Sequence, residues 1–380
     1  MKLFHWLTTA ALLLCLTVVV FGAYVRLSDA GLGCPDWPGC YGHLTVPTEA
    51  QHVAQAEQSF PDRPVQAPKA RKEMIHRYLA STLGLLILGL TALSFRDDCP
   101  NRKLPKVLLA LVIFQGLLGM WTVTWLLKPL VVTGHLLGGM TTLALLTWLW
   151  LDTLDARAAE ILEDSAAVPA SRLDPHTPDF RNEREAWAGM QVESSTPERY
   201  TGLRFGAGLA LALLAGQIFL GGWTSSNYAA LACPDLPTCQ GQLWPQLDVK
   251  EAFTLWRGLG RSYEYGVLDN RARVTIHHLH RVGALVVSLV LAVLGWWLWR
   301  RGAPWQRYAQ VILGLLGLQL LVGIGMVLLQ LPLLLADAHN AGAALLLLAV
   351  TALNHRAWRA QPPDYSTRGQ APDYSTRGRA

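Results

Sequence analysis

Eight long apolar runs constrain this chain of 380 residues more than any other feature of its sequence. A helix needs about 20 mostly apolar residues to cross a bilayer, and each run is close to that length. The predicted spans cover residues 4–25, 76–95, 106–126, 130–151, 204–224, 277–299, 308–330 and 333–353. They explain why only 16% of the residues are charged, well below the roughly 25% of soluble domains. The sequence therefore predicts an all-α integral membrane protein.

Basic residues in the short loops predict the orientation of the spans. The loops after spans two and six carry Arg96, Arg102, Lys103 and Lys106, and Arg300, Arg301 and Arg307, respectively. The short turns at the opposite ends hold only Lys128. Because cytoplasmic loops are enriched in Lys and Arg, we predict that both termini are cytoplasmic. The net charge of +5 then needs no nucleic-acid partner to explain it.

The first run follows Lys2, as the apolar region of a signal peptide would. It is longer than such a region, and Tyr24-Val25-Arg26 is a poor cleavage site. We therefore expect a retained helix.

The chain repeats one unit. Cys34 matches Cys233 at an offset of 199, and His76 matches His280 at an offset of 204. The offset of 204 continues through the pairs Gln115 and Gln319, Gly119 and Gly323, His135 and His339, and Gly138 and Gly342. Both units begin on the same side, as parallel repeats do. We predict two tandem pseudo-symmetric four-helix bundles, 1–151 and 203–355.

Two polar segments lie outside these units. Residues 152–202 are predicted to form a cytoplasmic linker with a short surface helix around 181–187. Residues 356–380 contain PDYSTRG twice, and because this tail has little apolar surface to bury it is predicted to be disordered.

A short motif, C-P-D-x-P-x-C, follows the first span of each unit. The predicted orientation places both copies outside the cytoplasm, where disulfides persist. We predict the disulfides Cys34–Cys40 and Cys233–Cys239. A structural role, thiol exchange with a partner and a transient link to a substrate all remain open for them.

Four histidines occupy matched positions within the predicted spans: His76 and His135 in the first unit, and His280 and His339 in the second. Ionisable residues at membrane depth are costly and usually functional. Two imidazoles from facing helices can hold a haem through its two axial positions. The alternatives are hydrogen bonds between helices and a metal other than haem iron.

Three arginines lie near these histidines, and one acid distinguishes the two units. Arg26, Arg77 and Arg281 are candidate ligands of haem propionates, or else interfacial arginines that reach water. Glu73 lies three residues before His76, on the same helix face, whereas its match is His277. A carboxylate beside a bound macrocycle can take up a proton or stabilise positive charge. We therefore predict that the first unit performs chemistry, the alternative being an interfacial ion pair of Glu73 with Lys69 or Lys72.

The sequence resembles the haem A synthase family, CtaA/Cox15. The resemblance rests on RLSDAGLGCPDWPGCYG at 26–42, EMIHR at 73–77, GHLLGG at 134–139, HHLHR at 277–281 and AHNAG at 338–342. It implies an enzyme of the bacterial inner membrane that oxidises the ring methyl of haem O to the formyl group of haem A, by successive hydroxylations, for assembly of cytochrome c oxidase. Haem O synthase and oxidase assembly factors are then expected partners. A quinone electron acceptor and homo-oligomerisation are left open.

The resemblance also assigns roles to the candidate residues. It implies that His76 and His135 flank the substrate haem O, that His280 and His339 ligate a haem b cofactor, and that Glu73 is the catalytic carboxylate. Two other readings remain open: a di-haem b-type electron carrier, which would predict identical sites, and a quinone-linked thiol oxidase, which would leave the histidines unused.

Overall fold

The computed structural model describes residues 2–96, 99–166 and 197–359. Its helices are α1 (Lys2–Leu27), α2 (Ala50–Ser59), α3 (Ala67–Leu93), α4 (Leu104–Thr124), α5 (Pro129–Ala166), α7 (Pro197–Ser226), α8 (Val249–Ala252), α9 (Asn270–Arg300), α10 (Trp305–Leu328) and α11 (Leu333–Arg359). Within the described ranges, eight helices are long and apolar enough to span a membrane. The prediction of an all-helical, multi-pass membrane protein is therefore confirmed.

Helices α3, α7 and α9 begin seven to nine residues earlier than the hydropathy of the sequence predicted, so residues 197–202, assigned to the linker, belong to α7. Pro68 lies in the first turn of α3, where its missing N–H is harmless. The side chain of Asp269 accepts a hydrogen bond from the backbone N–H of Ala272 and caps α9. As a result His76 and His280, predicted at the starts of their helices, lie more than two turns inside them.

The predicted boundaries after the fourth span of each unit also shift. Residues 152–166, assigned to the linker, continue α5 to Ala166, and α11 continues to Arg359. The predicted surface helix at 181–187 and the predicted disorder of the tail beyond 359 lie outside the described residues.

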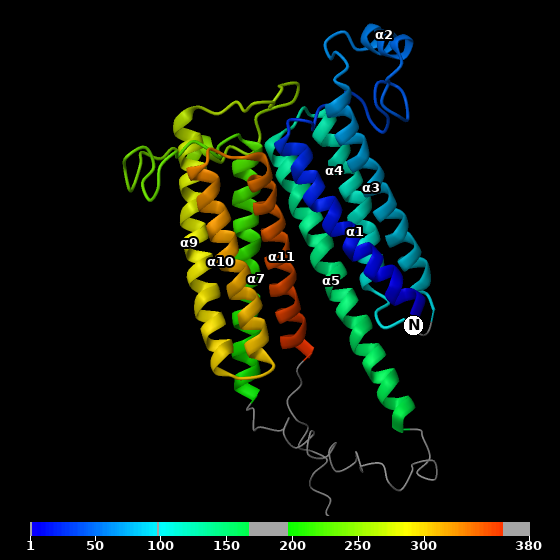
Figure 1. The fold of residues 1–380 in the computed structure, drawn as a ribbon, viewed down its shortest axis with the longest axis vertical. Coiled ribbons are helices and arrows are strands. Elements are labelled where there is room, and N and C mark those ends of the chain that lie inside the picture. Colours follow the sequence, from blue (N-terminus) through cyan, green and yellow to red (C-terminus); the bar gives the residue numbers. More distant parts are fainter. Residues whose placement is uncertain (1, 97–98, 167–196, 360–380) are drawn as a thin grey trace, which may run out of the picture.

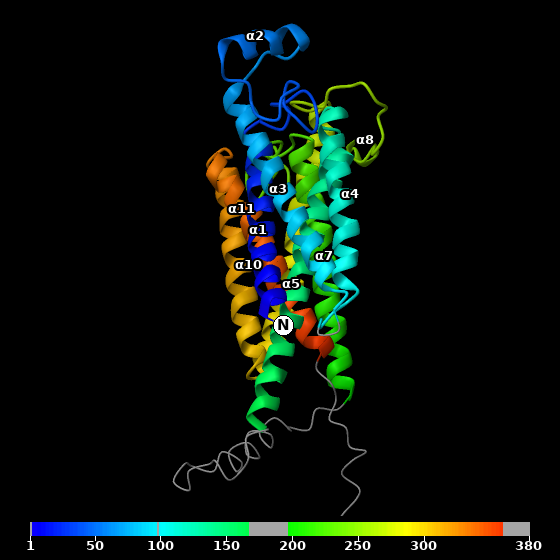
Figure 2. The ribbon, with the colours of Figure 1, turned by 90° about the vertical axis from the view of Figure 1, so that its right-hand side faces the viewer.

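The spanning helices pack in two groups (Figures 1 and 2). In the N-terminal group, α1 contacts α3 and α5, and α4 contacts the same two helices. In the C-terminal group, α7 contacts α9 and α11, and α10 contacts the same two helices. Helices α1, α5, α7 and α11 join the groups, around a core of buried Leu, Ile and Ala side chains. The pseudo-symmetry between the groups stays a prediction from the sequence repeat.

The connections that follow α1 and α7 lie at one end of the molecule, here called the loop end, and the N-terminus lies at the opposite end (Figure 1). At the loop end, Lys128 is only 1% exposed. Its Nζ donates to the carbonyl of Gly258 at 2.7 Å and lies over the ring of Trp256. This contact fastens the turn between α4 and α5 to the connection that precedes α9.

A second polar joint lies at the opposite end. Asp152 of α5 is 3% exposed and accepts hydrogen bonds from three side chains. These are His355 at 3.0 Å, Asn101 at 2.9 Å, and Arg359. The two groups of helices are therefore joined by polar contacts at both ends of the spans.

Candidate functional site

A cavity of about 690 Å³ lies mainly within the N-terminal group, and α7 and α11 of the C-terminal group add Gly222, Ser225 and Asn340 to its wall. Five of the predicted site residues line it: Arg26, Glu73, His76, Arg77 and His135. They come from α1, α3 and α5, and most of the other lining residues are Leu, Val and Gly. This volume is within the range of ligand pockets, about 300–1,000 Å³. The structure thus brings the first-unit candidates to one largely apolar site.

The imidazoles of His76 and His135 face each other across this site. Their ring centroids are 6.5 Å apart and their planes make an angle of 82°. A metal atom between two imidazoles forms two bonds to nitrogen of about 2 Å each, as in zinc sites. Adding the distance from each nitrogen to the centre of its ring gives a separation close to the observed 6.5 Å. In both rings Nδ1 is buried and has no hydrogen-bond partner among the described residues. This arrangement fits a single metal atom held between the two rings.

A glycine lies against each of the four predicted histidine ligands. A methyl group at Gly22 would lie 2.7 Å from Cε1 of His76, and one at Gly119 would lie 3.5 Å from Cε1 of His135. The matching distances are 3.3 Å for Gly221 with His280 and 3.1 Å for Gly323 with His339. Both units therefore make room for their imidazoles in the same way.

Glu73 is 5% exposed and joins the cavity wall to the first disulfide loop. One carboxylate oxygen accepts from the backbone N–H of Cys34 at 2.9 Å, and the other accepts from Arg77 at 2.5 Å. The pairing with Lys69 or Lys72 considered from sequence is not the one observed, and Lys72 lies over the ring of Tyr24 instead.

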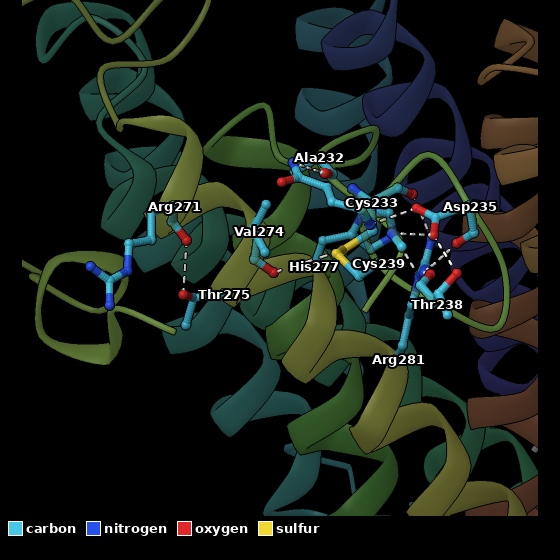
Figure 3. Close-up of a disulfide and its surroundings, with 12 residues drawn as sticks. Ala232, Cys233, Asp235, Thr238, Cys239, Arg271, Val274, Thr275, His277 and Arg281 are labelled. Atoms are coloured by element: carbon cyan, nitrogen blue, oxygen red, sulfur yellow. Dashed lines mark hydrogen bonds between the residues drawn. A yellow bond between two sulfur atoms is a disulfide. The ribbon is translucent and has the colours of Figure 1, made fainter. Parts of the chain in front are cut away.

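His277 anchors the second disulfide loop in the same manner (Figure 3). Its Nδ1 accepts from the backbone N–H of Cys233 at 3.2 Å, and its Nε2 lies 3.3 Å from Nε of Arg281. Glu73 and His277 thus share a structural task that the sequence did not reveal. What remains particular to Glu73 is a carboxylate in the wall of the cavity.

Both C-P-D-x-P-x-C segments form compact disulfide loops. Cys34 is bonded to Cys40 and Cys233 to Cys239. In each loop the aspartate of the motif accepts two backbone N–H groups beyond the second cysteine: Asp36 from Tyr41 and Gly42, and Asp235 from Gln240 and Gly241.

The hydrogen bonds to Asp235 also affect its acidity. Those from Thr238 and from the backbone N–H of Gly241 lower the pKa of Asp235 to about 2. The charged form of this carboxylate is therefore the one that closes the second loop.

The three candidate arginines have partners in the protein. Arg77 donates to the carbonyls of Pro38 and Gly39 as well as to Glu73. Arg281 donates to the carbonyls of Asp235, Thr238 and Cys233. Both arginines therefore hold the disulfide loops to the helices that carry the histidines, rather than reaching into water.

Arg26 is different. It donates to the carbonyl of Ser225 at 2.9 Å and lies over the ring of Tyr228, so it reaches from α1 into the C-terminal group. Its Nε is buried and has no hydrogen-bond partner among the described residues, in the wall of the cavity. This N–H is a donor available to an anionic group.

In the C-terminal group two glutamines contact the candidate histidines, and sequence reasoning gave them no role. Nε2 of Gln217 lies 3.0 Å from Nδ1 of His280, and Nε2 of Gln319 lies 3.3 Å from Nε2 of His339. The sequence repeat could have drawn attention to Gln319, because it matches Gln115 at the offset of 204. Gln217 matches Val18 at the offset of 199, so the repeat could not reveal it.

The donor chemistry of the C-terminal group suits a haem more than a bare metal ion. Across the described ranges, no group of three or more His, Cys, Asp or Glu side chains is placed to hold a metal. Nδ1 of His339 is buried without a hydrogen-bond partner there. Two imidazoles, each held by a glutamine, fit a metal whose other positions are filled by a macrocycle.

Comparisons with known proteins agree with these features. The model of a family of cytochrome oxidase assembly proteins, COX15-CtaA, matches residues 5–351. The chain is similar to the heme A synthase of Shewanella oneidensis, at 42% identity over 353 residues, covering 93% of this chain and 96% of that one.

More distant relatives carry the same description. The heme A synthase of Methylobacterium radiotolerans is 30% identical over 362 residues, covering 91% of this chain and 87% of its own. That of Caulobacter vibrioides is 27% identical over 387 residues, covering 94% and 96%. From the family match over most of its length, the chain belongs to the COX15-CtaA family of cytochrome oxidase assembly proteins.

Proposed function

We propose that this protein is a haem A synthase, a membrane oxidoreductase that converts haem O into haem A for cytochrome oxidase assembly. One observation carries the proposal: in a member of this family, a cavity large enough for a macrocycle holds two facing imidazoles and a buried carboxylate. Membership of the family alone would not indicate where the reaction occurs.

In this proposal haem O lies between His76 and His135 as the substrate. Arg26 would bind a propionate of the substrate, and its buried Nε–H without a hydrogen-bond partner among the described residues supports this role. Arg77 serves instead to hold Glu73 and the first loop, since its contacts are already made within the protein. Arg281 has the corresponding structural task in the second unit.

Glu73 is the proposed catalytic residue. In each of two hydroxylations of the substrate's ring methyl, water supplies the oxygen atom, two electrons pass to the electron acceptor and two protons are released. The resulting gem-diol then loses water to give the formyl group. A carboxylate in a water-poor cavity can take up the protons released in these steps or stabilise positive charge on the carbon. The hydrogen bonds from Arg77 and from the backbone N–H of Cys34 fix the direction of the carboxylate. A quinone is the proposed class of electron acceptor.

His280 and His339 are the proposed ligands of a haem b cofactor, which would supply one-electron redox chemistry when bound. Gln217 and Gln319 would hold these imidazoles in place through the contacts described above. The predicted location is the bacterial inner membrane, with both termini in the cytoplasm and the disulfide loops outside.

The test is co-expression with a haem O synthase in a host without haem A, followed by chromatography of the extracted pigments. Haem A together with haem B is the expected result. Haem B alone would contradict the synthase and support the di-haem electron carrier, and a colourless protein would contradict both.

A further inference from the structure

The cavity reaches the outer surface of the helices between α3 and α4. Leu85 and Leu88 of α3 and Ile113 of α4 all line the cavity. Their side chains are nevertheless 68%, 50% and 60% exposed. A side chain that lines a cavity and also faces outward marks a place where the cavity opens. Because both helices span the membrane, this opening faces lipid.

Helices α3 and α4 leave this side of the molecule uncovered. They contact α1, α5 and each other, and they lie on the side away from α9 and α10 (Figure 1). They also pack against each other less extensively than α9 packs against α10, the matching pair of the C-terminal group.

Small residues line the cavity where the two helices separate. A methyl group added at Gly84 of α3 or at Gly116 of α4 would meet no atom within 4 Å. At the offset of 204 these glycines become Ser288 and Leu320. Ser81, also in the lining, becomes Leu285, whereas Leu88 and Ile113 become the smaller Ala292 and Gly317. The second unit thus carries larger side chains at the two glycine positions and at Ser81, and smaller ones at Leu88 and Ile113.

The opening lies deeper in the membrane than the imidazoles. Gly84 follows His76 by eight residues, about 12 Å along a helix axis. On α4, Gly116 lies about one turn from Gly119, which contacts His135. A ligand held between the imidazoles could thus extend an apolar group toward the middle of the bilayer.

We propose that this α3–α4 opening receives the isoprenoid chain of haem O directly from the lipid. The inference rests on the proposed function. The macrocycle lies between the imidazoles, and the chain passes between Leu85 and Leu88 on one side and Ile113 on the other. Moving an apolar chain from lipid into water costs free energy, and each methylene group that stays in apolar surroundings avoids that cost. The substrate therefore enters sideways, without leaving the membrane.

The test compares two ligands that share a macrocycle. The purified full chain, reconstituted in lipid nanodiscs, is titrated with haem O and with haem B, which lacks the isoprenoid chain. For each haem, binding in the cavity is defined as the binding that is lost in the variant His76→Ala. Two variants, Gly84→Leu and Gly116→Leu, narrow the opening. Gly89→Leu is the matched control, because Gly89 also has free space around it on α3 but does not line the cavity.

We expect each narrowing variant to weaken haem O binding about tenfold, which corresponds to losing the burial of about two methylene groups. Haem B binding should change less than about twofold, and Gly89→Leu should resemble the wild type for both ligands. Unchanged haem O binding in both narrowing variants would overturn the proposal, and so would an equal loss of both haems.

Two further outcomes separate related ideas. Suppose that the wild type binds haem O more tightly than haem B, that the narrowing variants lose this preference, and that no haem A forms. The proposal about the opening is then supported and the proposed function is contradicted. If haem O binding is unaffected while phospholipid co-purifies with the wild type and not with Gly116→Leu, the opening holds a lipid acyl chain and the proposal is wrong.

Discussion

Glu73 combines two tasks that its repeat match keeps apart. Both Glu73 and His277 accept the backbone N–H of the first cysteine in a disulfide loop and contact the arginine one turn later. Only Glu73 adds a carboxylate to the cavity wall. Because an imidazole can replace a carboxylate as the loop anchor, the two tasks can be tested separately.

The variant Glu73→His should keep the first disulfide loop and lose haem A formation. The imidazole can accept from Cys34 as His277 does from Cys233, but it supplies no negative charge to the reaction. Removing one electrostatic group of an active site typically lowers the rate about 100-fold. Haem A is measured by chromatography and the disulfide by non-reducing mass mapping. The control is His277→Glu, which should leave haem A formation intact, and wild-type activity of Glu73→His would exclude catalysis by this carboxylate.

The charge of Asp235 should control the order of the second loop. Its folded pKa of about 2 lies below the ordinary value of 3.8. The carboxylate therefore stabilises the loop above pH 3.8, and that stabilisation is lost as the pH falls through about 2. Between pH 7 and pH 4 no change is expected. The variant Asp235→Asn should lose part of this order already at pH 7.

Hydrogen exchange at the backbone amides of Gln240 and Gly241, corrected for the intrinsic effect of pH, measures this order. Equal protection in the wild type and in Asp235→Asn at pH 7 would show that the hydrogen bonds to the charged carboxylate do not hold the loop. The corresponding amides of Tyr41 and Gly42 serve as the internal control in both proteins.

At the scale of helices, the sequence predicted which segments cross the membrane but not where they begin. Hydropathy falls at Lys69, Arg71 and Lys72, so the prediction began the second span at 76, although α3 begins at Ala67. A proline in the first turn was a local signal that could have placed the boundary. The N-cap Asp269 was a comparable signal for α9.

The sequence predicted the site residues that repeat in both units. It did not predict contacts between side chains of different helices. The offset of 204 identified His76 and His135, and the structure places both in one cavity. Nothing local to Gln217 or Asp152 indicated their contacts with His280 and His355. Such contacts depend on how helices far apart in the sequence are packed, which no short pattern encodes.

The close contact between α1 and α3 should depend on Gly22. A methyl group there would lie 2.7 Å from the ring of His76, so Gly22→Ala must displace the imidazole or separate the helices. We expect haem O to bind about tenfold more weakly, with an altered absorption spectrum. Gly89→Ala is the control, because a methyl group at Gly89 has free space. A wild-type spectrum and affinity in Gly22→Ala would contradict the proposed place of His76.

For the molecule as a whole, the buried Asp152 should hold the two groups of helices together at the end opposite the loops. The variant Asp152→Ala leaves His355 and Arg359 without their shared acceptor. Arg359 is half exposed, so the main cost is that of leaving the buried His355 without its acceptor, about 1–3 kcal/mol. We expect a clear fall in the unfolding temperature of the purified protein in detergent.

The control for this change is Asp155→Ala. Asp155 has a side chain that is 56% exposed, and its carboxylate lies 4.0 Å from Nε2 of His355, so its loss should have little effect. An equal fall of the unfolding temperature in the two variants would show that the buried position of Asp152 does not strengthen the contact between the two groups of helices.

The wall of the cavity is not built from the N-terminal group alone. Gly222, Ser225 and Asn340, from α7 and α11, contribute to its lining, and Arg26 is held by the carbonyl of Ser225. If the chain arose by fusion of two copies of one gene, the ancestral product would have needed to dimerise before its pocket was complete. Severing the covalent connection today should therefore yield fragments that work only when they reassociate, and neither half would be an enzyme by itself.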